Sequence, residues 1–304
     1  MSQIMTEALV DAGRHRAFAL IEEVVEHLAA GPYVSHIHLC GPAAHGDPVP
    51  VEGITLAVAV HDRHVADLWQ VLDPLVLTDL GAVLPGWQDR RCASADREAV
   101  YLIGRGSTLT RLRIRVMPTS MAGCFPPNLP TRLIYGTEPA ADRPSDAVPR
   151  PAEPGSAPRP TATAAELLVE LLCLLHQASD RAHRGLFLES YGDMADVRAA
   201  LRDLVALSLG ETVPGGSWYG IDAALSHTTI GRACRRELRN LVSSLPSGEP
   251  AQISAILDTC LRVVRLTAPQ VLTELSGQID SYRRYLDIPA DERTLVAAPT
   301  GGGA

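Results

Sequence analysis

The sequence contains no lysine, so all 27 of its cationic residues are arginine. This absence excludes a lysine Schiff base, the phosphate-binding lysine of a P-loop and a serine–lysine nucleophile pair. Arginine without lysine, together with abundant Ala, Pro and Gly, is typical of coding in GC-rich bacteria. The number of arginines is therefore not by itself evidence for an anion site.

Aromatic residues, long apolar runs and paired cysteines are also scarce. Aromatics make up 4% of the chain, so its cores must be aliphatic. No apolar run approaches the about 20 residues that a membrane-spanning helix needs, and no signal-peptide pattern is present. The six scattered cysteines form no C-x-x-C pair, and their spacing does not resemble a structural zinc site. We expect a cytoplasmic protein with reduced thiols and no membrane partner.

The net charge of −8 disfavours a nucleic-acid partner, which would require a basic surface to neutralise phosphates. A length of 304 residues with 46% hydrophobic content is sufficient for two globular domains. We expect the partner to be a small-molecule substrate or ligand. Self-association into a homo-oligomer is left open.

The apolar periodicity of the first half predicts a mixed sheet with helices over residues 1–137. The segment 54–60 (ITLAVAV) is apolar at almost every position, as in a strand buried on both faces. Asp62 is in place to cap the helix that follows it. The expected elements are helix 6–28, strand 35–40, strand 54–60, helix 63–75, strand 99–104 and strand 112–117.

Proline, alanine, aspartate and serine then replace the apolar periodicity, which predicts a linker over residues 138–160. After it, Thr163 and Glu166 have the spacing of a capping box. Helical spacing continues through 194–209, 228–245 and 250–286, with a break expected at Pro269. The predicted fold class is α+β: the mixed sheet, an all-α helical bundle over 161–290 and a tail over 291–304.

One motif resembles that of a known superfamily. Leu39 to Asp47 (LCGPAAHGD), followed by Glu52 to Val58 (EGITLAV), resembles the signature of the polymerase-beta-like nucleotidyltransferases. In that superfamily a strand ends in Gly-Ser, the turn often continues to Gly-Asp, and the next strand carries Asp-x-Asp. The opening helix and the appended helical domain are similar in layout to the antibiotic nucleotidyltransferases in particular.

The resemblance implies a site in which Gly-Ser amides approach a triphosphate and three aspartates bind divalent metal ions. At the matching positions Gly41 keeps the glycine, Pro42 replaces the serine, and Gly53 and Thr55 replace the paired aspartates. The third aspartate falls near Arg113. Divalent cations need oxygen ligands, so we expect neither a metal nor a nucleotide cofactor.

The site could still bind a metal ion or an anion in two ways. Asp47, Glu52 or Asp62 could supply metal ligands if the register differs, although a slip of one residue turns a side chain to the opposite face of a strand. Alternatively, Arg113 and Arg115, which share a strand face, could bind an anion without a metal. The simpler interpretation of these two arginines is a solvated sheet face.

Histidines and aromatics complete the candidate residues. His36, His38 and His45 lie near the same turn, and could form a metal site or a proton-transfer pair, or be ordinary surface or hydrogen-bonded histidines. Trp218 and Tyr219 are candidates for shaping a ligand cleft, with core or interface packing as the alternative. The residues proposed for catalysis are Arg113, His45 and Tyr219. Those proposed for ligand binding are Gly41, Pro42, Asp47, Glu52, Thr55, Arg115 and Trp218.

Three functions remain open from the sequence. The first is a repurposed nucleotidyltransferase fold that binds a small organic molecule in an interdomain cleft and catalyses a metal-free reaction, such as a cyclisation in bacterial specialised metabolism. The second is an active antibiotic-type nucleotidyltransferase that uses ATP and Mg²⁺. The third is a non-catalytic binding or regulatory partner.

Overall fold

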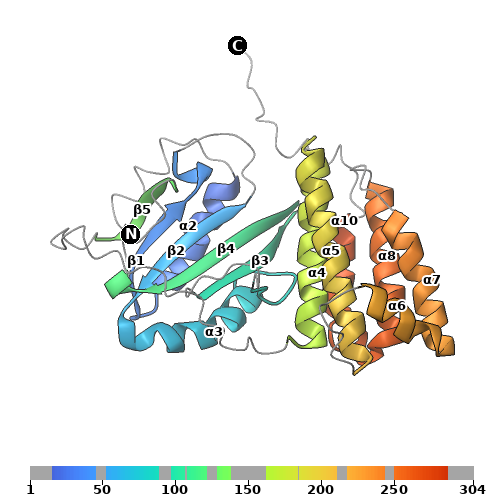
Figure 1. Ribbon diagram of the computed structural model, residues 1–304. Helices are drawn as coiled ribbons and strands as arrows, with labels where there is room; N and C mark the ends of the chain where they lie inside the picture. Colours follow the sequence, from blue (N-terminus) through green and yellow to red (C-terminus); the bar gives the residue numbers. More distant parts are fainter. Residues whose placement is uncertain are drawn as a thin grey trace, which may run out of the picture. The chain divides into compact units, whose positions relative to one another are not determined.

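The computed structural model of the chain divides into two compact units (Figure 1). The first comprises Met1–Arg105 and Leu109–Arg159, and the second Gly106–Thr108 and Pro160–Ala304. The structure describes residues 16–45, 53–88, 97–106, 108–121, 129–137, 162–183, 185–210, 218–243 and 250–286. The predicted linker (138–160) and tail (291–304) lie outside the described residues.

The first unit is built on a mixed five-stranded sheet with the strand order β3-β4-β2-β1-β5. β1 is antiparallel to both β2 and β5, whereas β2 and β4 are parallel. The α+β class and the mixed sheet expected from the sequence are thereby confirmed. The strands are β1 Val34–Cys40, β2 Ile54–Val60, β3 Arg97–Arg105, β4 Thr108–Pro118 and β5 Thr131–Gly136.

The central position of β2 explains its apolar sequence. It pairs with β1 on one side and with β4 on the other, so both of its edges are hydrogen-bonded. Six of its seven residues are buried, and Thr55 is the half-buried exception. A strand covered on both faces must be apolar at successive positions rather than at alternate ones.

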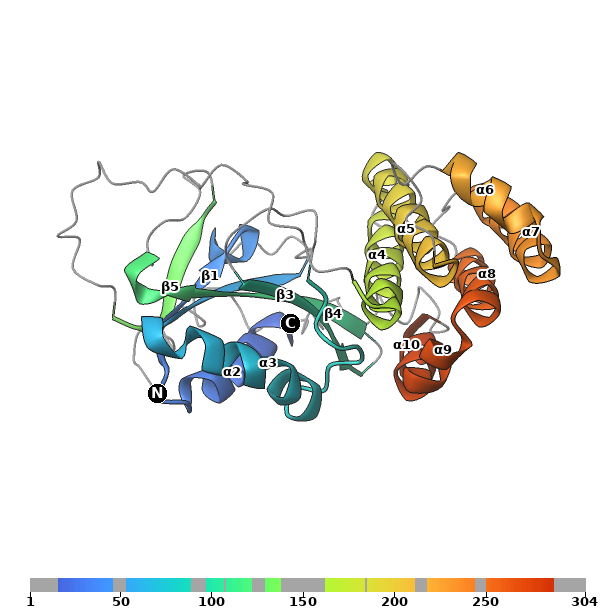
Figure 2. The same cartoon turned by 60° about the horizontal axis from the view of Figure 1, so that its bottom comes forward.

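Two helices, α2 (Arg16–Ala29) and α3 (Val65–Thr78), cover one face of this sheet (Figure 2). Their inward side chains, among them Val24 and Leu72, join alternate strand residues such as Leu56 and Ile114 in a single aliphatic core. The buried residues of this core are aliphatic apart from Tyr101, in keeping with the low aromatic content. Burial of this face fixes the register of every strand, because a one-residue slip would expose it.

Two sequence-based details of the first unit are corrected by the structure. The edge strand β5 was not predicted, because only Ile134 among its six residues is buried and no clear alternation results. Asp62 does not cap α3: its Oδ1 accepts hydrogen bonds from the hydroxyl of Thr119 and the amide of Ser120, at 3.0 and 3.1 Å. It thus ties the start of the helical segment to the end of β4.

The second unit is helical throughout its described elements, and its first helix begins at the predicted capping box. The amide of Thr163 donates to Oε2 of Glu166 at 2.7 Å, and the amide of Glu166 donates to the Thr163 hydroxyl at 3.2 Å. The break at Pro269 is confirmed. The helices are α4 Ala164–His183, α5 Phe187–Ser208, α6 Trp218–Ser226, α7 Thr229–Ser243, α8 Pro250–Thr267, α9 Pro269–Glu274 and α10 Ser276–Leu286.

Polar contacts fix the pairing of helices within this unit. Asp193 of α5 accepts hydrogen bonds from Gln177 and Arg181 of α4, at 2.7 and 2.8 Å, and burial raises the pKa of its carboxyl. The hydroxyl of Tyr282 in α10 donates to the carbonyl of Leu172 in α4 at 3.0 Å.

Helix α6 was not predicted from the sequence; it follows directly on residues outside the described set. Within the described part of the chain, no helix has the length and apolarity to cross a membrane.

Candidate functional site

The two faces of the sheet differ in chemistry. The face under α2 and α3 is apolar, whereas the opposite face, called the second face below, carries imidazoles, a thiol, guanidiniums and a carboxylate. Strand alternation assigns the residues to it. Its members are His36, His38, Cys40, Thr55, Ala57, Ala59, Glu98, Arg113, Arg115 and Met117.

Strand pairing brings part of the predicted site together on this face. Thr55 lies opposite Cys40 on one side and Arg113 on the other. In the next row, Ala57 lies between His38 and Arg115. The predicted residues Thr55, Arg113 and Arg115 are therefore neighbours, with small side chains on β2 separating the guanidiniums of β4 from the imidazole and thiol of β1.

A carboxylate that the sequence analysis did not select holds the two arginines. Glu98 of β3 lies with its Oε1 atom 2.9 Å from Nη1 of Arg113 and its Oε2 atom 3.1 Å from Nη2 of Arg115. Nε of Arg115 also donates to Oε2 at 3.2 Å. The interpretation of Arg113 and Arg115 as a purely solvated pair is thereby corrected, because both make ion pairs with a buried residue.

The sequence held a signal for Glu98. Arg113 and Arg115 are two apart on one strand, and Glu98 is the second residue of the neighbouring strand of the same hairpin. Opposite charges on facing strand positions stabilise each other. An Arg-x-Arg pair on one strand therefore predicts a carboxylate on the neighbouring strand. The signal was missed because the strand was expected to begin at Ala99, and Glu98 was left outside it.

The turn after β1 differs from a phosphate-binding turn in its donors. The amide of Gly41 donates to the carbonyl of Pro130 at 2.8 Å, and Pro42 has no amide hydrogen. Gly41 has a φ of 79°, a left-handed conformation that suits glycine. Neither backbone position offers the free donor that the resemblance implies for a triphosphate.

Gly53 is held by its surroundings as a glycine. Its φ is 136°, and an added Cβ would lie 2.6 Å from the carbonyl oxygen of Arg111. An aspartate at this position, which matches the first metal ligand of the superfamily, would require the backbone to move. The backbone at Gly53 therefore leaves no room for a carboxylate-bearing side chain.

The histidines of β1 are buried rather than exposed at the surface. The rings of His36 and His38 make an edge contact with centroids 5.3 Å apart, and Nδ1 of His36 lies 3.2 Å from the Ser35 hydroxyl. His45 ends the short helix Pro42–His45, but its side chain lies outside the described set. Of the three histidines that the sequence placed near one turn, the structure therefore describes the side chains of His36 and His38.

Burial makes Cys40 a poor candidate for a nucleophile on this face. Burial raises the pKa of its thiol to about 11, although the nearby Arg115 acts in the opposite direction. Burial likewise raises the pKa values of Cys234 and Cys260, to about 11 and about 12. A neutral thiol is a poor nucleophile and a poor metal ligand.

The remaining predicted residues do not join this group. Asp47 and Glu52 lie outside the described residues. Trp218 and Tyr219 begin α6 in the second unit, where Trp218 is half-buried and Tyr219 is 86% exposed. Core packing is therefore wrong for Tyr219, whereas interface packing stays a prediction.

The charge of the second face favours anions over divalent cations. Two arginines and one glutamate leave an excess of one positive charge beside Thr55. Among the described residues, no three His, Cys, Asp or Glu side chains are grouped so as to hold a metal ion. A divalent cation would meet electrostatic repulsion here, whereas a carboxylate or a polarised carbonyl oxygen would be attracted.

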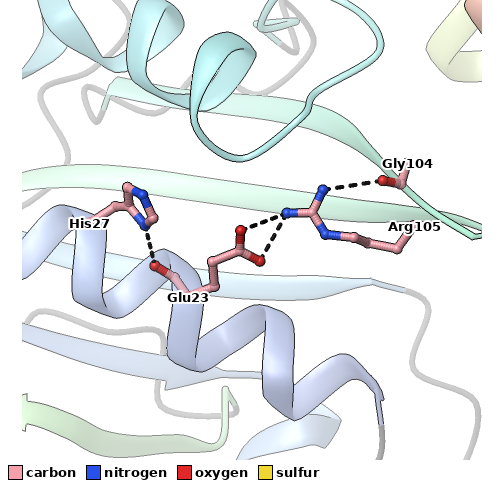
Figure 3. A network of polar contacts seen from close by, with 4 residues as sticks. All are labelled: Glu23, His27, Gly104 and Arg105. Atoms are coloured by element: carbon pink, nitrogen blue, oxygen red, sulfur yellow. Dashed lines mark hydrogen bonds and ion pairs between the residues drawn. The ribbon is translucent and has the colours of Figure 1, made fainter.

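A second arginine–glutamate pair lies on the helix-covered side and has a structural role (Figure 3). Nη2 of Arg105 donates to both carboxylate oxygens of Glu23 at 2.8 Å, and Nη1 contacts the Gly104 carbonyl. His27 contacts the backbone carbonyl of Glu23. This bidentate pair joins α2 to the end of β3.

Comparison with protein families and with curated proteins found no relative of this chain. The sequence matches no protein-family model, and no curated protein matches it either.

Proposed function

We propose that the protein is a repurposed nucleotidyltransferase-like fold that binds a small organic molecule against the second face of its sheet. The ligand is converted there without a metal, as in a cyclisation in bacterial specialised metabolism. The group recognised by Arg113 and Arg115 is an anionic or carbonyl oxygen. The charge of this face is the observation that carries the proposal.

Three substitutions at the positions matching the metal ligands support the loss of nucleotide chemistry. Gly53 lacks a side chain and lacks room for one, Thr55 contributes only a hydroxyl, and Arg113 brings a positive charge beside it. Mg²⁺ needs several oxygen ligands, usually with carboxylates among them. The arginines that exclude Mg²⁺ are suited to an organic oxyanion.

A metal is not required for an intramolecular reaction. A protein surface that holds one molecule in a reactive conformation saves the entropy of bringing two reactants together. Guanidinium donors directed at a carbonyl oxygen stabilise the negative charge that develops there in the transition state. A cyclisation can be catalysed by orientation and guanidinium donors alone, because it needs neither a second substrate nor an electron donor.

The test is to incubate the full-length chain with a bacterial small-molecule extract in EDTA and without added nucleotide. Mass spectrometry would search for compounds that are consumed and converted to an isomer or a dehydrated product. We expect Arg113→Ala to abolish the conversion. Arg105→Ala is the control, because it removes a glutamate-paired arginine from the other face. A conversion that requires Mg²⁺ and ATP, or one that Arg113→Ala leaves unchanged, would refute the proposal.

A further inference from the structure

We infer that Glu98 is an internal competitor for Arg113, and that the ligand of the second face carries a single carboxylate that draws Arg113 away from it. Arg115 then keeps the charge of Glu98 neutralised. This inference rests on the proposed function, since it assumes that Arg113 binds the ligand. It adds the chemical class of the ligand and a residue that regulates its affinity.

The two arginines hold Glu98 unequally. Arg115 makes an aligned hydrogen bond from Nε to Oε2, with Nη2 close to the same atom. Arg113 lies 2.9 Å from Oε1, yet no hydrogen bond from any described residue reaches that oxygen. Charge alone holds Arg113, so a ligand can recruit it at lower cost than Arg115.

Exposure places the arginines in the path of an incoming anion. The side chain of Glu98 is 7% exposed, whereas those of Arg113 and Arg115 are 27% and 22% exposed. A ligand therefore meets guanidinium groups first and the carboxylate lies beneath them. A buried carboxylate that lost both partners would be strongly destabilised, which is why Arg115 must stay in place.

Charge and shape indicate a monocarboxylate. Two guanidiniums and one carboxylate leave one positive charge, which one monoanion neutralises. Each guanidinium is a planar fork that matches a planar carboxylate. With a ligand bound, each arginine would face one carboxylate, and no charge would remain uncompensated among these residues.

The experiment measures binding of benzoate and of inorganic phosphate to the full-length protein by calorimetry. We expect Glu98→Gln to bind benzoate about tenfold more tightly than the parent, the effect of one charge-assisted contact. Adding Arg113→Ala to Glu98→Gln should remove this gain. Glu23→Gln is the matched control, because it removes the same charge from the pair with Arg105 on the opposite face. It should bind benzoate as the parent does.

The outcomes separate this inference from the proposed function. Equal or weaker benzoate binding by Glu98→Gln refutes the internal competitor, and the proposed function survives if Arg113→Ala alone still weakens binding. No effect of either substitution refutes both. Tighter binding of phosphate than of benzoate refutes the monocarboxylate. If Glu98→Gln fails to fold, Glu98→Asp takes its place: its shorter carboxylate should also release Arg113 and tighten binding, and equal or weaker binding refutes the inference.

Discussion

Thr55 and Arg113 are direct neighbours across the parallel strands β2 and β4. Their side chains share the second face of the sheet, where a hydroxyl and a guanidinium occur at positions that match metal-binding aspartates in the superfamily that the motif resembles. The pairing places the positive charge of Arg113 directly beside Thr55, a position that carries no carboxylate.

Gly53→Ala should destabilise the first unit by about 1–3 kcal/mol, since its φ of 136° is strained for any other residue and the new Cβ would meet the Arg111 carbonyl. Urea unfolding measures the change. Gly192→Ala is the control: that glycine lies within α5 with open space around it, so alanine should stabilise by about 0.5–1 kcal/mol. A neutral Gly53→Ala would show that this backbone is free to accept a side chain.

Thr163→Ala should lower the free energy of unfolding by about 1 kcal/mol, because the first amides of α4 lose their capping hydroxyl. Glu166→Gln is the matched variant, since glutamine can still accept from the Thr163 amide and complete the capping box. Denaturant unfolding followed by helical circular dichroism measures both. A loss in Thr163→Ala no larger than that in Glu166→Gln would contradict the larger contribution of the hydroxyl.

Tyr101→Phe should cost about 1–2 kcal/mol, because the fully buried hydroxyl donates to Oδ1 of Asp73 at 2.5 Å. Tyr135→Phe, at a half-buried position packed against the same core, should cost less. Thermal unfolding of the two variants beside the parent measures the difference. Equal losses would mean that the contact with Asp73 adds no stability.

The same tyrosine predicts a dependence on alkaline pH. Burial, followed by the contact with Asp73, raises the pKa of Tyr101 above its ordinary value. The unfolded chain therefore releases the Tyr101 proton at a lower pH than the folded chain. The contribution of this proton to the free energy of unfolding is complete below about pH 10 and is lost as the pH rises further. Unfolding measured from pH 8 upward should show a decline that is shallower in Tyr101→Phe. Parallel declines in the two proteins would contradict the assignment.

The strands that form the centre of the sheet could be predicted because burial dictates their composition. β2 was predicted at its observed bounds, Ile54–Val60, since seven successive apolar or small residues have few other structures open to them. The cap formed by Thr163 and Glu166 could be predicted equally well, because a capping box depends on local spacing alone. β5 was not, because an edge strand with a single buried residue has no such constraint.

The site was harder to predict than the fold because its contacts join different strands. Arg113 and Arg115 were found from their spacing within one strand, whereas Glu98 depends on how β3 pairs with β4. The steric obstacle to a side chain at Gly53 likewise comes from Arg111, which is distant in sequence. Local patterns indicate which residues share a face, and only the register shows which of them touch.

The most direct test of the account is a calorimetric titration of the full-length protein with ATP, in Mg²⁺ and again in EDTA. The account predicts no Mg²⁺-dependent binding in the micromolar range, because Gly53 and Thr55 supply no carboxylate and Arg113 repels the metal. A dissociation constant near 1 μM, equivalent to about −8 kcal/mol, that is lost in EDTA would contradict it and would assign the protein to nucleotide chemistry.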